Sequence, residues 1–359
     1  MKILIVTGIY PPDIGGPANF TPEISEFLAS KGHSTQVLTL SDGLNPLGKS
    51  ESKVRRIQRK GRVIRRLKTV FWIIRYGKSA DKILVTGLYE EVGLASLFLN
   101  TKIVMRIVGD PIWERARNTH STTENIDEFN KSGSDPTFQR KFLSWAINRG
   151  HLCITPSEQL RDFMIRWNIT RQIKVIPNGV SIPEMTRQVL DYRSITVSRL
   201  VSWKNVSLVI DTAIKCGLPL RIVGDGPLEN QLKPYESDGV IQFLGRKNKI
   251  EVSDLLKDSS VFFLLSSYEG QSFALTEALA NGLFCVVSEI PGNTQLIKHL
   301  ENGFVFKLSD QENSTAELGE VLSDKNLVNA ISARARKYAI LNLDSEVIAN
   351  QIMEELAGL

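Results

Sequence analysis

Several patterns that mark particular classes of protein are scarce or missing in this sequence. Only three of its 359 residues are cysteine (Cys153, Cys216 and Cys285), and they lie far apart. They form no Cys-x-x-Cys or Cys/His cluster, so we expect neither a disulfide framework nor a zinc site. No apolar run reaches the roughly 18 residues of a membrane-spanning helix. These absences favour a cytoplasmic protein with reduced, buried thiols.

Length and composition indicate an ordinary globular protein of two domains. A chain of 359 residues is long for a single hydrophobic core. Its 42% hydrophobic and 23% charged residues are typical of globular domains. The opening MKILIVTGIYPP has too short an apolar run for a secretory signal, and we expect a buried strand there.

Positive charge is concentrated in one segment. Residues 53–78, from Lys53 to Lys78, contain eleven Lys or Arg and no acid, although the whole chain carries a net charge of only +5. Removing those eleven charges leaves −6 for the remainder. A nucleic-acid binder more often spreads basic residues over a docking face or has a known module. Neither pattern is present, so nucleic acid is not an expected partner.

The same segment has the spacing of an amphipathic helix, interrupted by Gly61. Its apolar residues recur mostly every three or four positions, and these are Ile57, Ile64, Leu67, Val70, Phe71 and Ile74. One interpretation is a helix that covers a sheet with its apolar stripe inward. The other is a peripheral contact with an anionic membrane surface, which would bring a lipid-linked acceptor to the first domain.

Short β-branched runs alternate with helical patterns along the whole chain, which predicts parallel sheets covered by helices on both faces. The expected strands of the first half are 2–6, 35–39, 82–86, 103–107 and 152–155. The pattern restarts with expected strands at 194–197, 220–223, 241–243, 261–265 and 284–287. The join is expected near IPNGVSIPEM, residues 176–185, where two prolines and an Asn-Gly break the periodicity. Residues 114–140 are polar and weakly periodic, and we expect a long functional excursion.

Candidate ligand-binding groups follow several of these strands, and ligands of open α/β sheets lie beyond the carboxyl ends of strands. Gly15 and Gly16 precede a helix and could admit a phosphate, or form a plain strand-to-helix turn. Arg199 and Lys204 could converge on one anion, or be two solvated cations. The Gly-Asp-Gly-Pro sequence at 224–227 predicts a tight turn, which could lie under a ligand or equally well bind nothing.

Two carboxylates stand eight positions apart in SSYEGQSFALTEALANG, residues 266–282. The expected strand ends before this stretch, Glu269 lies in the following loop, and Glu277 lies on a helix that Gly282 closes. Carboxylates accept paired hydrogen bonds from vicinal hydroxyls, whereas cations bind a diphosphate. Because a sugar nucleotide presents both groups, the combination favours such a ligand.

These pieces together resemble the retaining glycosyltransferases of family 4. The resemblance is carried, in order, by PPDIGG, PSEQL, VIPNGV, SRLVSWKN, VGDGP, FLGR and the Glu-x7-Glu of SYEGQSFALTEALANG, which extend over essentially the whole chain. It implies the α/β GT-B fold, with two Rossmann-like, doubly wound domains facing a central cleft. The implied domains are an acceptor-binding domain (1–180), a nucleotide-sugar-binding domain (181–342) and a C-terminal helix (343–359) that packs back toward the first domain.

The resemblance also implies roles for particular residues. The first glutamate of such enzymes contacts the donor sugar, the second holds the ribose hydroxyls, and the Arg/Lys pair binds the diphosphate. Glu269, Arg199 and Lys204 are therefore the expected catalytic residues. The expected donor-binding residues are Gly15, Gly16, Arg199, Lys204, Arg246, Glu269, Gly270, Gln271, Ser272, Phe273, Ala274 and Glu277.

The sequence departs from the family pattern at two places. In RIVGDPIWERA, Gly109 stands where family members usually have a histidine, and Asp110 and Glu114 follow it. A subset of related enzymes resembles this Gly-Asp-x-x-Trp-Glu pattern, so Asp110 and Glu114 are candidates for acceptor or sugar recognition. After the first glutamate, the usual Phe-Gly is replaced by Gln271 and Ser272, which implies a more polar pocket beside the sugar.

The implied reaction transfers a hexose from a nucleoside diphosphate sugar to a hydroxyl acceptor with retention of configuration, in the synthesis of cell-surface polysaccharide or glycolipid. No cofactor or metal is expected, since the chain lacks an Asp-x-Asp motif. One alternative is a sugar-nucleotide epimerase of the same fold, which would act by elimination without an acceptor. Another is a catalytically weak sugar-nucleotide-binding protein, because the usual histidine is missing. The implied location is the cytoplasm, with peripheral contact at the inner membrane face.

Overall fold

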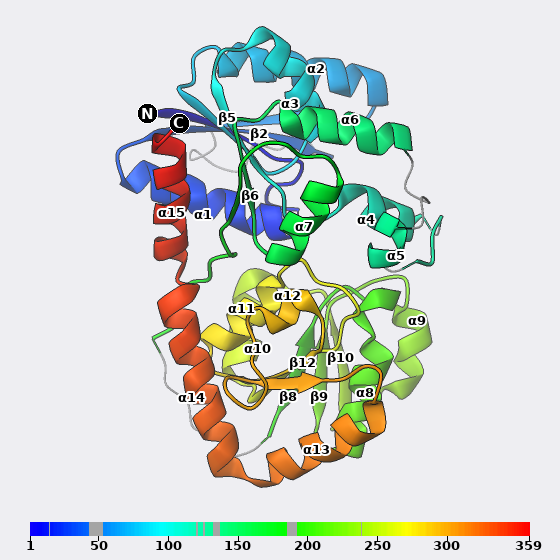
Figure 1. The fold of residues 1–359 in the computed structure, drawn as a ribbon. Helices are drawn as coiled ribbons and strands as arrows, with labels where there is room; N and C mark the ends of the chain where they lie inside the picture. Colours follow the sequence, from blue (N-terminus) through cyan, green and yellow to red (C-terminus); the bar gives the residue numbers. More distant parts are fainter. Residues whose placement is uncertain are drawn as a thin grey trace. The chain divides into compact units, whose positions relative to one another are not determined.

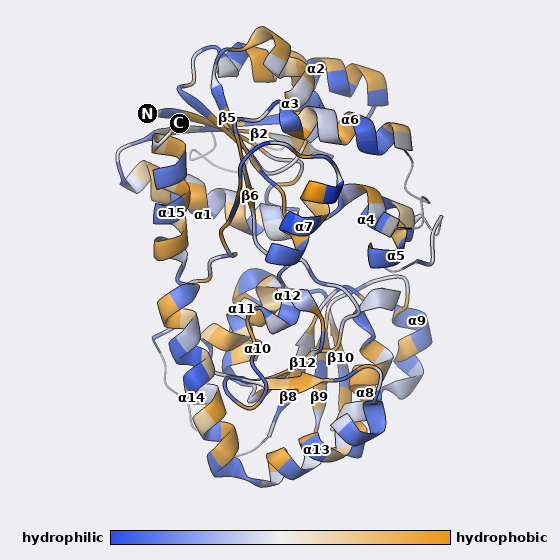
Figure 2. Ribbon diagram, viewed as in Figure 1, coloured by the Kyte–Doolittle hydropathy of each residue, from blue (hydrophilic) through white to orange (hydrophobic). Residues whose placement is uncertain are grey.

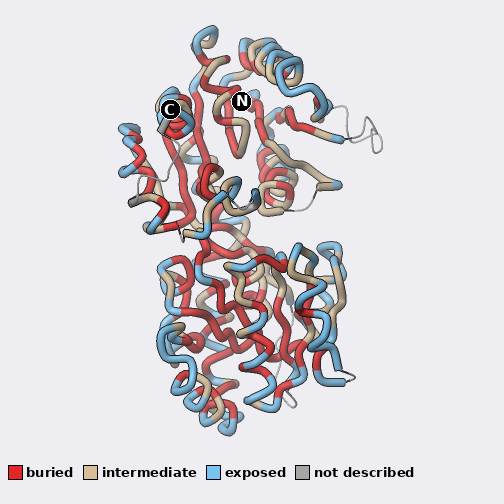
Figure 3. Tube along the Cα trace, turned by 90° about the vertical axis from the view of Figure 1, so that its right-hand side faces the viewer, coloured by how far each residue is buried: buried red, intermediate tan, exposed pale blue. Residues whose placement is uncertain are grey.

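The computed structural model describes residues 1–13, 15–42, 53–119, 121–124, 126–131, 137–184, 192–237 and 239–359. Its contacts divide the chain into two compact units (Figure 1). The first unit contains Met1–Pro177 and Ile348–Leu359, and the second contains Asn178–Val347. In both units buried stretches of the chain alternate with exposed ones (Figure 3).

The first unit is built on a parallel sheet of seven strands. Their order across the sheet is β3-β2-β1-β4-β5-β6-β7. Their bounds are Lys2–Val6 (β1), Ser34–Ser41 (β2), Val54–Gln58 (β3), Lys82–Val85 (β4), Lys102–Arg106 (β5), Leu152–Thr155 (β6) and Ile173–Val175 (β7). The central strands β1, β4, β5 and β6 are buried along most of their length, and most of their buried side chains are apolar, as expected of a sheet covered on both faces.

Helices follow most of these strands. Their bounds are Gly16–Ser30 (α1), Arg62–Gly77 (α2), Tyr89–Ala95 (α3), Ser96–Phe98 (η2), Pro111–Asn118 (α4), Ile126–Lys131 (α5), Thr137–Asn148 (α6) and Glu158–Arg166 (α7). The last helix of the chain, α15 (Ser345–Ala357), supplies the C-terminal part of this unit. Lys174 in β7 forms an ion pair of 3.2 Å with Glu355 in α15.

The second unit is a parallel sheet of six strands in the order β10-β9-β8-β11-β12-β13. The strands are Ser194–Val197 (β8), Leu220–Val223 (β9), Ile241–Gly245 (β10), Val261–Leu264 (β11), Phe284–Ser288 (β12) and Phe304–Phe306 (β13). The helices are Ser202–Lys204 (η3), Val206–Lys215 (α8), Glu229–Leu232 (α9), Lys233–Tyr235 (η4), Lys249–Lys257 (α10), Phe273–Ala280 (α11), Pro291–Thr294 (α12), Gln311–Ser323 (α13) and Lys325–Asn342 (α14).

Both faces of this second sheet are buried under helices. In β11 the neighbouring Phe262 and Phe263 belong to different hydrophobic clusters, because successive side chains of a strand point to opposite faces. Phe263 packs with the cluster that includes α8, and Phe262 packs with the one that includes α11. The continuous apolar run VFFL therefore predicted a fully buried strand correctly.

Of the two interpretations of residues 53–78, the single helix with its apolar stripe against a sheet is wrong, and the membrane contact stays a prediction. The first part, Val54–Gln58, is the edge strand β3, and Ile57 is buried in the sheet. The helix begins only after Gly61, whose positive φ of 75° ends the preceding segment. In α2 the buried side chains are Thr69 and Ile73, so the expected apolar stripe does not face the sheet.

The polar excursion predicted at 114–140 is more ordered than expected in its described part. It contains α4, α5 and the start of α6, and it has a small core of its own in which Trp113, Ile126 and Phe129 are buried. The Trp113 indole donates a hydrogen bond of 3.1 Å to the Glu124 carbonyl. Among the described helices, none is long and apolar enough to cross a membrane.

Candidate active site

The predicted cations and the first glutamate lie on loops that follow strands of the second unit. The loop after β8 carries Arg199 and leads to η3, which ends at Lys204. The loop after β11 carries Glu269, and α11 follows it. Because β8 and β11 are parallel neighbours in the sheet, their carboxyl ends meet at one edge.

Lys204 and Glu269 are in direct contact. The Lys204 ammonium lies 2.5 Å from Glu269 Oε1, and the two side chains are only 17% and 9% exposed. Ser266 donates a second hydrogen bond of 2.7 Å to the same oxygen. Glu269 Oε2 makes no hydrogen bond to a described residue, so the carboxylate keeps one oxygen available as an acceptor.

Arg199 differs from Lys204 in being exposed. It forms no ion pair with any residue that the structure describes. Its loop is held in place through the backbone, because Leu200 N–H donates to the Asp225 carbonyl at 2.8 Å. The Arg199 guanidinium is therefore a solvated cation on a fixed loop, which is a suitable starting state for binding an anion.

The Gly-Asp-Gly-Pro turn after β9 packs directly under the Arg199 loop. A Cβ added to Gly224 would overlap the Ser198 carbonyl, and one added to Gly226 would overlap the Leu200 backbone. Gly224 also has a φ of 137°, which side chains rarely adopt. These glycines are needed to bring the two loops together, which gives the turn a structural role whether or not a ligand contacts it.

The rest of the Glu269 loop is anchored by contacts across long sequence distances. Gln271 is buried, and its Oε1 accepts a hydrogen bond of 2.6 Å from the Asn178 backbone N–H. Asn178 Nδ2 donates in turn to the Gln271 carbonyl at 3.0 Å. The Gln271 side chain thus fixes the loop to the segment that begins the second unit, a role that the sequence did not reveal.

Helix α11 starts directly after this loop. Ser272 is its N-cap, and its hydroxyl accepts from Leu275 N–H at 3.3 Å. The N–H groups of Phe273 and Ala274 have no acceptor within the helix, as at any helix start. Glu277 is half-buried on the same helix, slightly more than one turn from its start.

Gly292 is a further residue that sequence reasoning missed. It lies in α12, and a Cβ at this position would overlap the Glu269 carbonyl oxygen and approach Glu269 Cβ to 3.2 Å. The only signal was the Pro-Gly dipeptide in EIPGN, which also occurs in ordinary turns. Arg246 is exposed after Gly245 and forms no ion pair with a described residue.

The predicted groups of the first unit lie in two separate places. Gly15, with a φ of 150°, is the N-cap of α1, and Gly16 is the first helical residue. A Cβ on Gly15 would come within 2.8 Å of the Ile9 side chain. The positive φ favours glycine at position 15, and phosphate binding there stays a prediction.

Asp110 is fully buried and serves the first unit itself. Its Oδ1 accepts from Ile112 N–H at 3.0 Å and from Trp113 N–H at 3.3 Å, so it is the N-cap of α4. Its Oδ2 forms an ion pair of 2.7 Å with Arg140 in α6. Hydroxyl recognition by Asp110 stays a prediction, whereas its capping role is visible.

Replacing Asp110 by alanine should destabilise the first unit. A buried ion pair that loses one partner leaves an uncompensated charge, here Arg140, which costs about 3–5 kcal/mol. Urea unfolding followed by fluorescence should show this loss, and Asp110→Asn should lose less because it retains an oxygen for the cap. A mutant that keeps its stability but loses activity would instead support hydroxyl recognition.

Gly109 and Glu114 are structurally linked. A Cβ on Gly109 would overlap Glu114 Oε1, so the glycine leaves the space that the glutamate carboxylate occupies. Glu114 is exposed as a whole, and it lies in the first turn of α4, the helix that follows β5. The Glu114 carboxylate therefore fills the space that a side chain at position 109 would take, and the sequence did not predict this.

Arg106, the last residue of β5, is a charged residue that sequence reasoning passed over. It is only 1% exposed, and its guanidinium carbon lies 3.9 Å from the Phe20 ring centre. Burial lowers the pKa of Arg106 to about 10, so it remains protonated near neutral pH. Burial also raises the pKa of the neighbouring Tyr89, whose hydroxyl donates to the Arg106 carbonyl at 2.8 Å.

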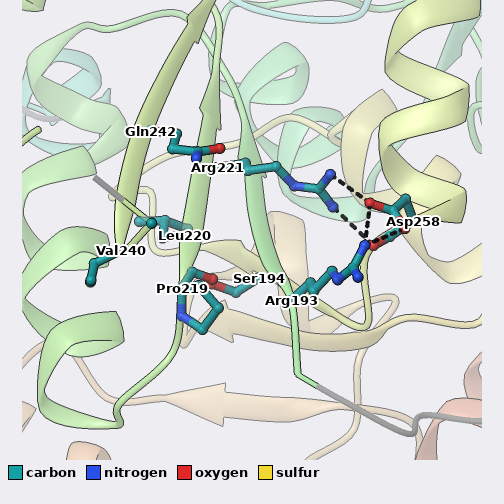
Figure 4. A pocket seen from close by; sticks show the side chains of 9 residues that line it. Arg193, Ser194, Pro219, Leu220, Arg221, Val240, Gln242 and Asp258 are labelled. Atoms are coloured by element: carbon teal, nitrogen blue, oxygen red, sulfur yellow. Dashed lines mark hydrogen bonds and ion pairs between the residues drawn. The ribbon is translucent and has the colours of Figure 1, made fainter. Parts of the chain in front are cut away.

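A hollow of about 320 Å³ lies at the other edge of the second sheet, where β8, β9 and β10 begin (Figure 4). Arg193 and Arg221 line it, and both form ion pairs with Asp258. Partial burial works in the opposite direction, but these two guanidinium groups hold the pKa of Asp258 below its usual value. The hollow is at the amino ends of the strands, away from Lys204 and Glu269, and its charged groups pair with one another.

Comparison with known proteins shows what part of the second unit is similar to. Residues 187–338 match the family of glycosyl transferases group 1. The second unit contains a glycosyl transferases group 1 domain. The match includes the Arg199, Lys204, Glu269 and Glu277 positions and none of the first unit.

Two curated relatives illustrate the range of similar proteins. An Escherichia coli UDP-Gal:alpha-D-GlcNAc-diphosphoundecaprenol alpha-1,3-galactosyltransferase is 32% identical over 195 residues, which are 47% of this chain and 50% of the relative. An alpha-monoglucosyldiacylglycerol synthase of Acholeplasma laidlawii is 22% identical over 350 residues, 87% of this chain and 86% of the relative. The chain spans half or less of the length of the first four curated relatives that it matches.

Solved structures extend the similarity of fold to the whole chain. The Anabaena protein Alr3699/HepE, crystallised in complex with UDP, superposes with a TM-score of 0.79 at 19% identity and covers 100% of both chains. A sucrose-phosphate synthase from Thermosynechococcus elongatus has a TM-score of 0.79 at 15% identity, covering 98% of this chain and 97% of that one. These neighbours are GT-B proteins, so the predicted fold of two Rossmann-like α/β domains is confirmed.

Proposed function

We propose that this protein is a retaining glycosyltransferase of family 4 that moves a hexose from a nucleoside diphosphate sugar to a hydroxyl acceptor. The observation that carries the proposal is the contact between Lys204 and Glu269 at the carboxyl edge of the second sheet. Both residues lie within the stretch that matches glycosyl transferases group 1. The Lys204 ammonium can pair with a diphosphate, and the Glu269 carboxylate can accept a hydrogen bond from a sugar hydroxyl. The product would be a cell-surface polysaccharide or glycolipid, as the names of several relatives suggest.

In this mechanism Lys204 and Glu269 exchange their contact with each other for contacts with the donor. A bound diphosphate attracts Lys204 away from Glu269, because two phosphate groups offer more negative charge than one carboxylate. Glu269 then keeps its hydrogen bond from Ser266 and accepts from a sugar hydroxyl. Donor binding would thus convert an internal ion pair into two contacts with the ligand.

The chemical step places developing negative charge on the leaving diphosphate. Arg199, Lys204 and the free N–H groups at the start of α11 would stabilise that charge in a fixed arrangement, which is usually the largest electrostatic contribution to catalysis. The C–O bond to the diphosphate breaks while the acceptor oxygen bonds to the same face of the anomeric carbon. The departing diphosphate accepts the acceptor's proton, so no protein nucleophile and no metal is required in this scheme.

Recognition of the sugar or acceptor is proposed for Glu114. Its carboxylate occupies the space above Gly109 at the carboxyl end of β5, the position of the histidine in the family pattern. An exposed carboxylate accepts hydrogen bonds from two neighbouring hydroxyls, whereas a histidine offers one ring nitrogen at a time. The acceptor is proposed to be lipid-linked and reached from the cytoplasmic side of the membrane.

A thermal-shift screen of the purified protein against UDP, GDP, ADP and their hexose conjugates tests the donor class. Ligands that bind the native state raise the unfolding temperature by mass action. We expect one nucleoside diphosphate and its sugar to raise it, and nucleoside monophosphates to raise it less. No shift with any of these compounds would contradict the proposed function.

The two glutamates should differ in the kind of loss that they cause. Glu277→Gln should chiefly weaken nucleotide binding, because half-buried Glu277 is assigned to the ribose. Glu269→Gln should lower turnover while leaving the affinity for free nucleoside diphosphate nearly intact. Calorimetric titration beside a donor-hydrolysis assay separates these results, and equal losses of nucleotide affinity would show that the roles are misassigned.

A further inference from the structure

Helix α2 of the first unit exposes a stripe of large apolar side chains. Val63, Ile64, Leu67 and Phe71 are 69%, 61%, 66% and 60% exposed. At 3.6 residues per turn these four positions fall within about 100° of the helix circumference. Figure 2 shows hydrophobic and hydrophilic residues mixed along this helix instead of the polar outer surface expected of a covering helix. Single exposed apolar residues are ordinary, but a contiguous stripe marks an interaction surface.

The stripe is accompanied by cations that the protein does not neutralise within its described part. Arg59 pairs with Asp13 and Asp42, and Arg65 and Arg66 lie near Glu91. Six other cations of the segment form no ion pair with a described residue, and these are Lys53, Lys60, Arg62, Lys68, Arg75 and Lys78. A surface with this excess of positive charge is complementary to a strongly anionic partner.

Cations flank the apolar stripe, as they do in helices that lie in a membrane interface. Lys68 and Arg75 are exposed and lie on the helix circumference directly beside the apolar arc. Trp72 is stacked against Tyr76 at 5.2 Å, and the Arg55 guanidinium lies 3.8 Å from its ring centre. Aromatic rings with polar ends, next to cations and apolar side chains, are the composition found at the boundary between lipid headgroups and acyl chains.

We propose that α2 is a docking surface for an anionic lipid bilayer. Val63, Ile64, Leu67 and Phe71 enter the headgroup region, and Lys68, Arg75 and their neighbours contact lipid phosphates. A protein partner would need its own acidic groove to match this surface, whereas an anionic leaflet supplies both negative charge and an apolar layer. The inference rests on the proposed function for its purpose, delivery of a lipid-linked acceptor, but docking can be measured without donor or acceptor.

The first experiment is flotation of the purified full chain with phosphatidylcholine vesicles, with and without phosphatidylglycerol. Binding should require phosphatidylglycerol and fall as salt rises. Lys68→Gln with Arg75→Gln should weaken it by roughly 25-fold, about fivefold per cation. Ile64→Ser with Leu67→Ser and Phe71→Ser should weaken it at high salt as well as at low salt. Ile250→Ser, which removes an apolar side chain that is 74% exposed on α10, is the matched control and should bind as wild type does.

The second experiment locates the contact. The difference in fluorescence between wild type and Trp72→Phe isolates Trp72, whose emission should shift to shorter wavelength on anionic vesicles and be quenched by brominated lipid. The proposal is overturned if wild type ignores anionic vesicles at low salt, or if the apolar triple variant binds them unchanged. It is also overturned if light scattering shows a dimer that the triple variant separates while vesicle binding persists, since the stripe would then bind a second copy.

Discussion

Replacing Lys204 by alanine should lower kcat/KM for glycosyl transfer by about 30- to 1,000-fold. Removal of one preorganised charge contact to the leaving group costs roughly 2–4 kcal/mol of transition-state stabilisation. Lys204 also forms an ion pair of 2.5 Å with Glu269, so the variant should additionally leave this largely buried carboxylate without its cation. Donor hydrolysis measured over a range of donor concentrations gives the kinetic loss.

Two companion variants separate these effects. Arg199→Ala should produce a similar kinetic loss without a change in unfolding temperature, since Arg199 is exposed and forms no ion pair with a described residue. Lys204→Arg should recover part of the activity, because it keeps the charge and changes the geometry. Wild-type turnover in either alanine variant would contradict the assignment of the diphosphate site.

Replacing Gly292 by alanine should lower the rate of donor hydrolysis by about 100-fold or more. The added Cβ would overlap the Glu269 carbonyl oxygen, which is backbone and cannot rotate away. The loop from Glu269 to Ser272 would have to move, and a displacement of 1 Å at a catalytic group can cost on the order of 100-fold in rate. The measurement is the donor-hydrolysis rate of Gly292→Ala together with its unfolding temperature.

The matched control for this variant is Gly319→Ala. Gly319 lies inside α13, and nothing lies within 4 Å of its added Cβ. Alanine there should leave activity unchanged and stabilise the protein by roughly 0.5–1 kcal/mol, because glycine loses more conformational freedom on folding. If both variants keep full activity, the position of the Glu269 loop does not depend on Gly292 and the geometric argument fails.

The strands of the second unit were predictable because both faces of its sheet are covered. Parallel buried strands read as continuous apolar runs, and VFFL and FCVVS end within one residue of the predicted bounds. Gly282 was predicted to close α11, and its φ of 69° fits that role. These features depend on local sequence alone.

The edge strand β3 was not predictable on the same basis. In VRRIQ only Ile57 is buried, and an edge strand with exposed cations lacks both the continuous and the alternating pattern. The neighbouring apolar residues of α2 have helical spacing, which extended the predicted helix backward over the strand. The spacing was correct for α2 but could not show which face is buried, because a stripe toward lipid and a stripe toward a sheet have the same periodicity.

The internal organisation of the candidate site depends on contacts between distant residues. Lys204 and Glu269 are 65 residues apart, and Asn178 and Gln271 are 93 apart. The resemblance named Lys204 and Glu269 as separate contacts to a donor and did not indicate that the two side chains contact each other. Likewise, the sequence did not indicate that Gln271 Oε1 accepts from the Asn178 N–H, and a more polar sugar pocket stays a prediction.

The most direct test of retaining glycosyl transfer is the anomeric configuration of the first-formed product. The purified protein is incubated with the nucleoside diphosphate hexose that the thermal-shift screen selects, in the presence of EDTA, and the products are followed by proton NMR. The account predicts slow release of nucleoside diphosphate and a first-formed hexose with the anomeric configuration of the donor, and both should be lost in Lys204→Ala. A first-formed product of inverted configuration, or a donor that wild type leaves intact, would contradict it.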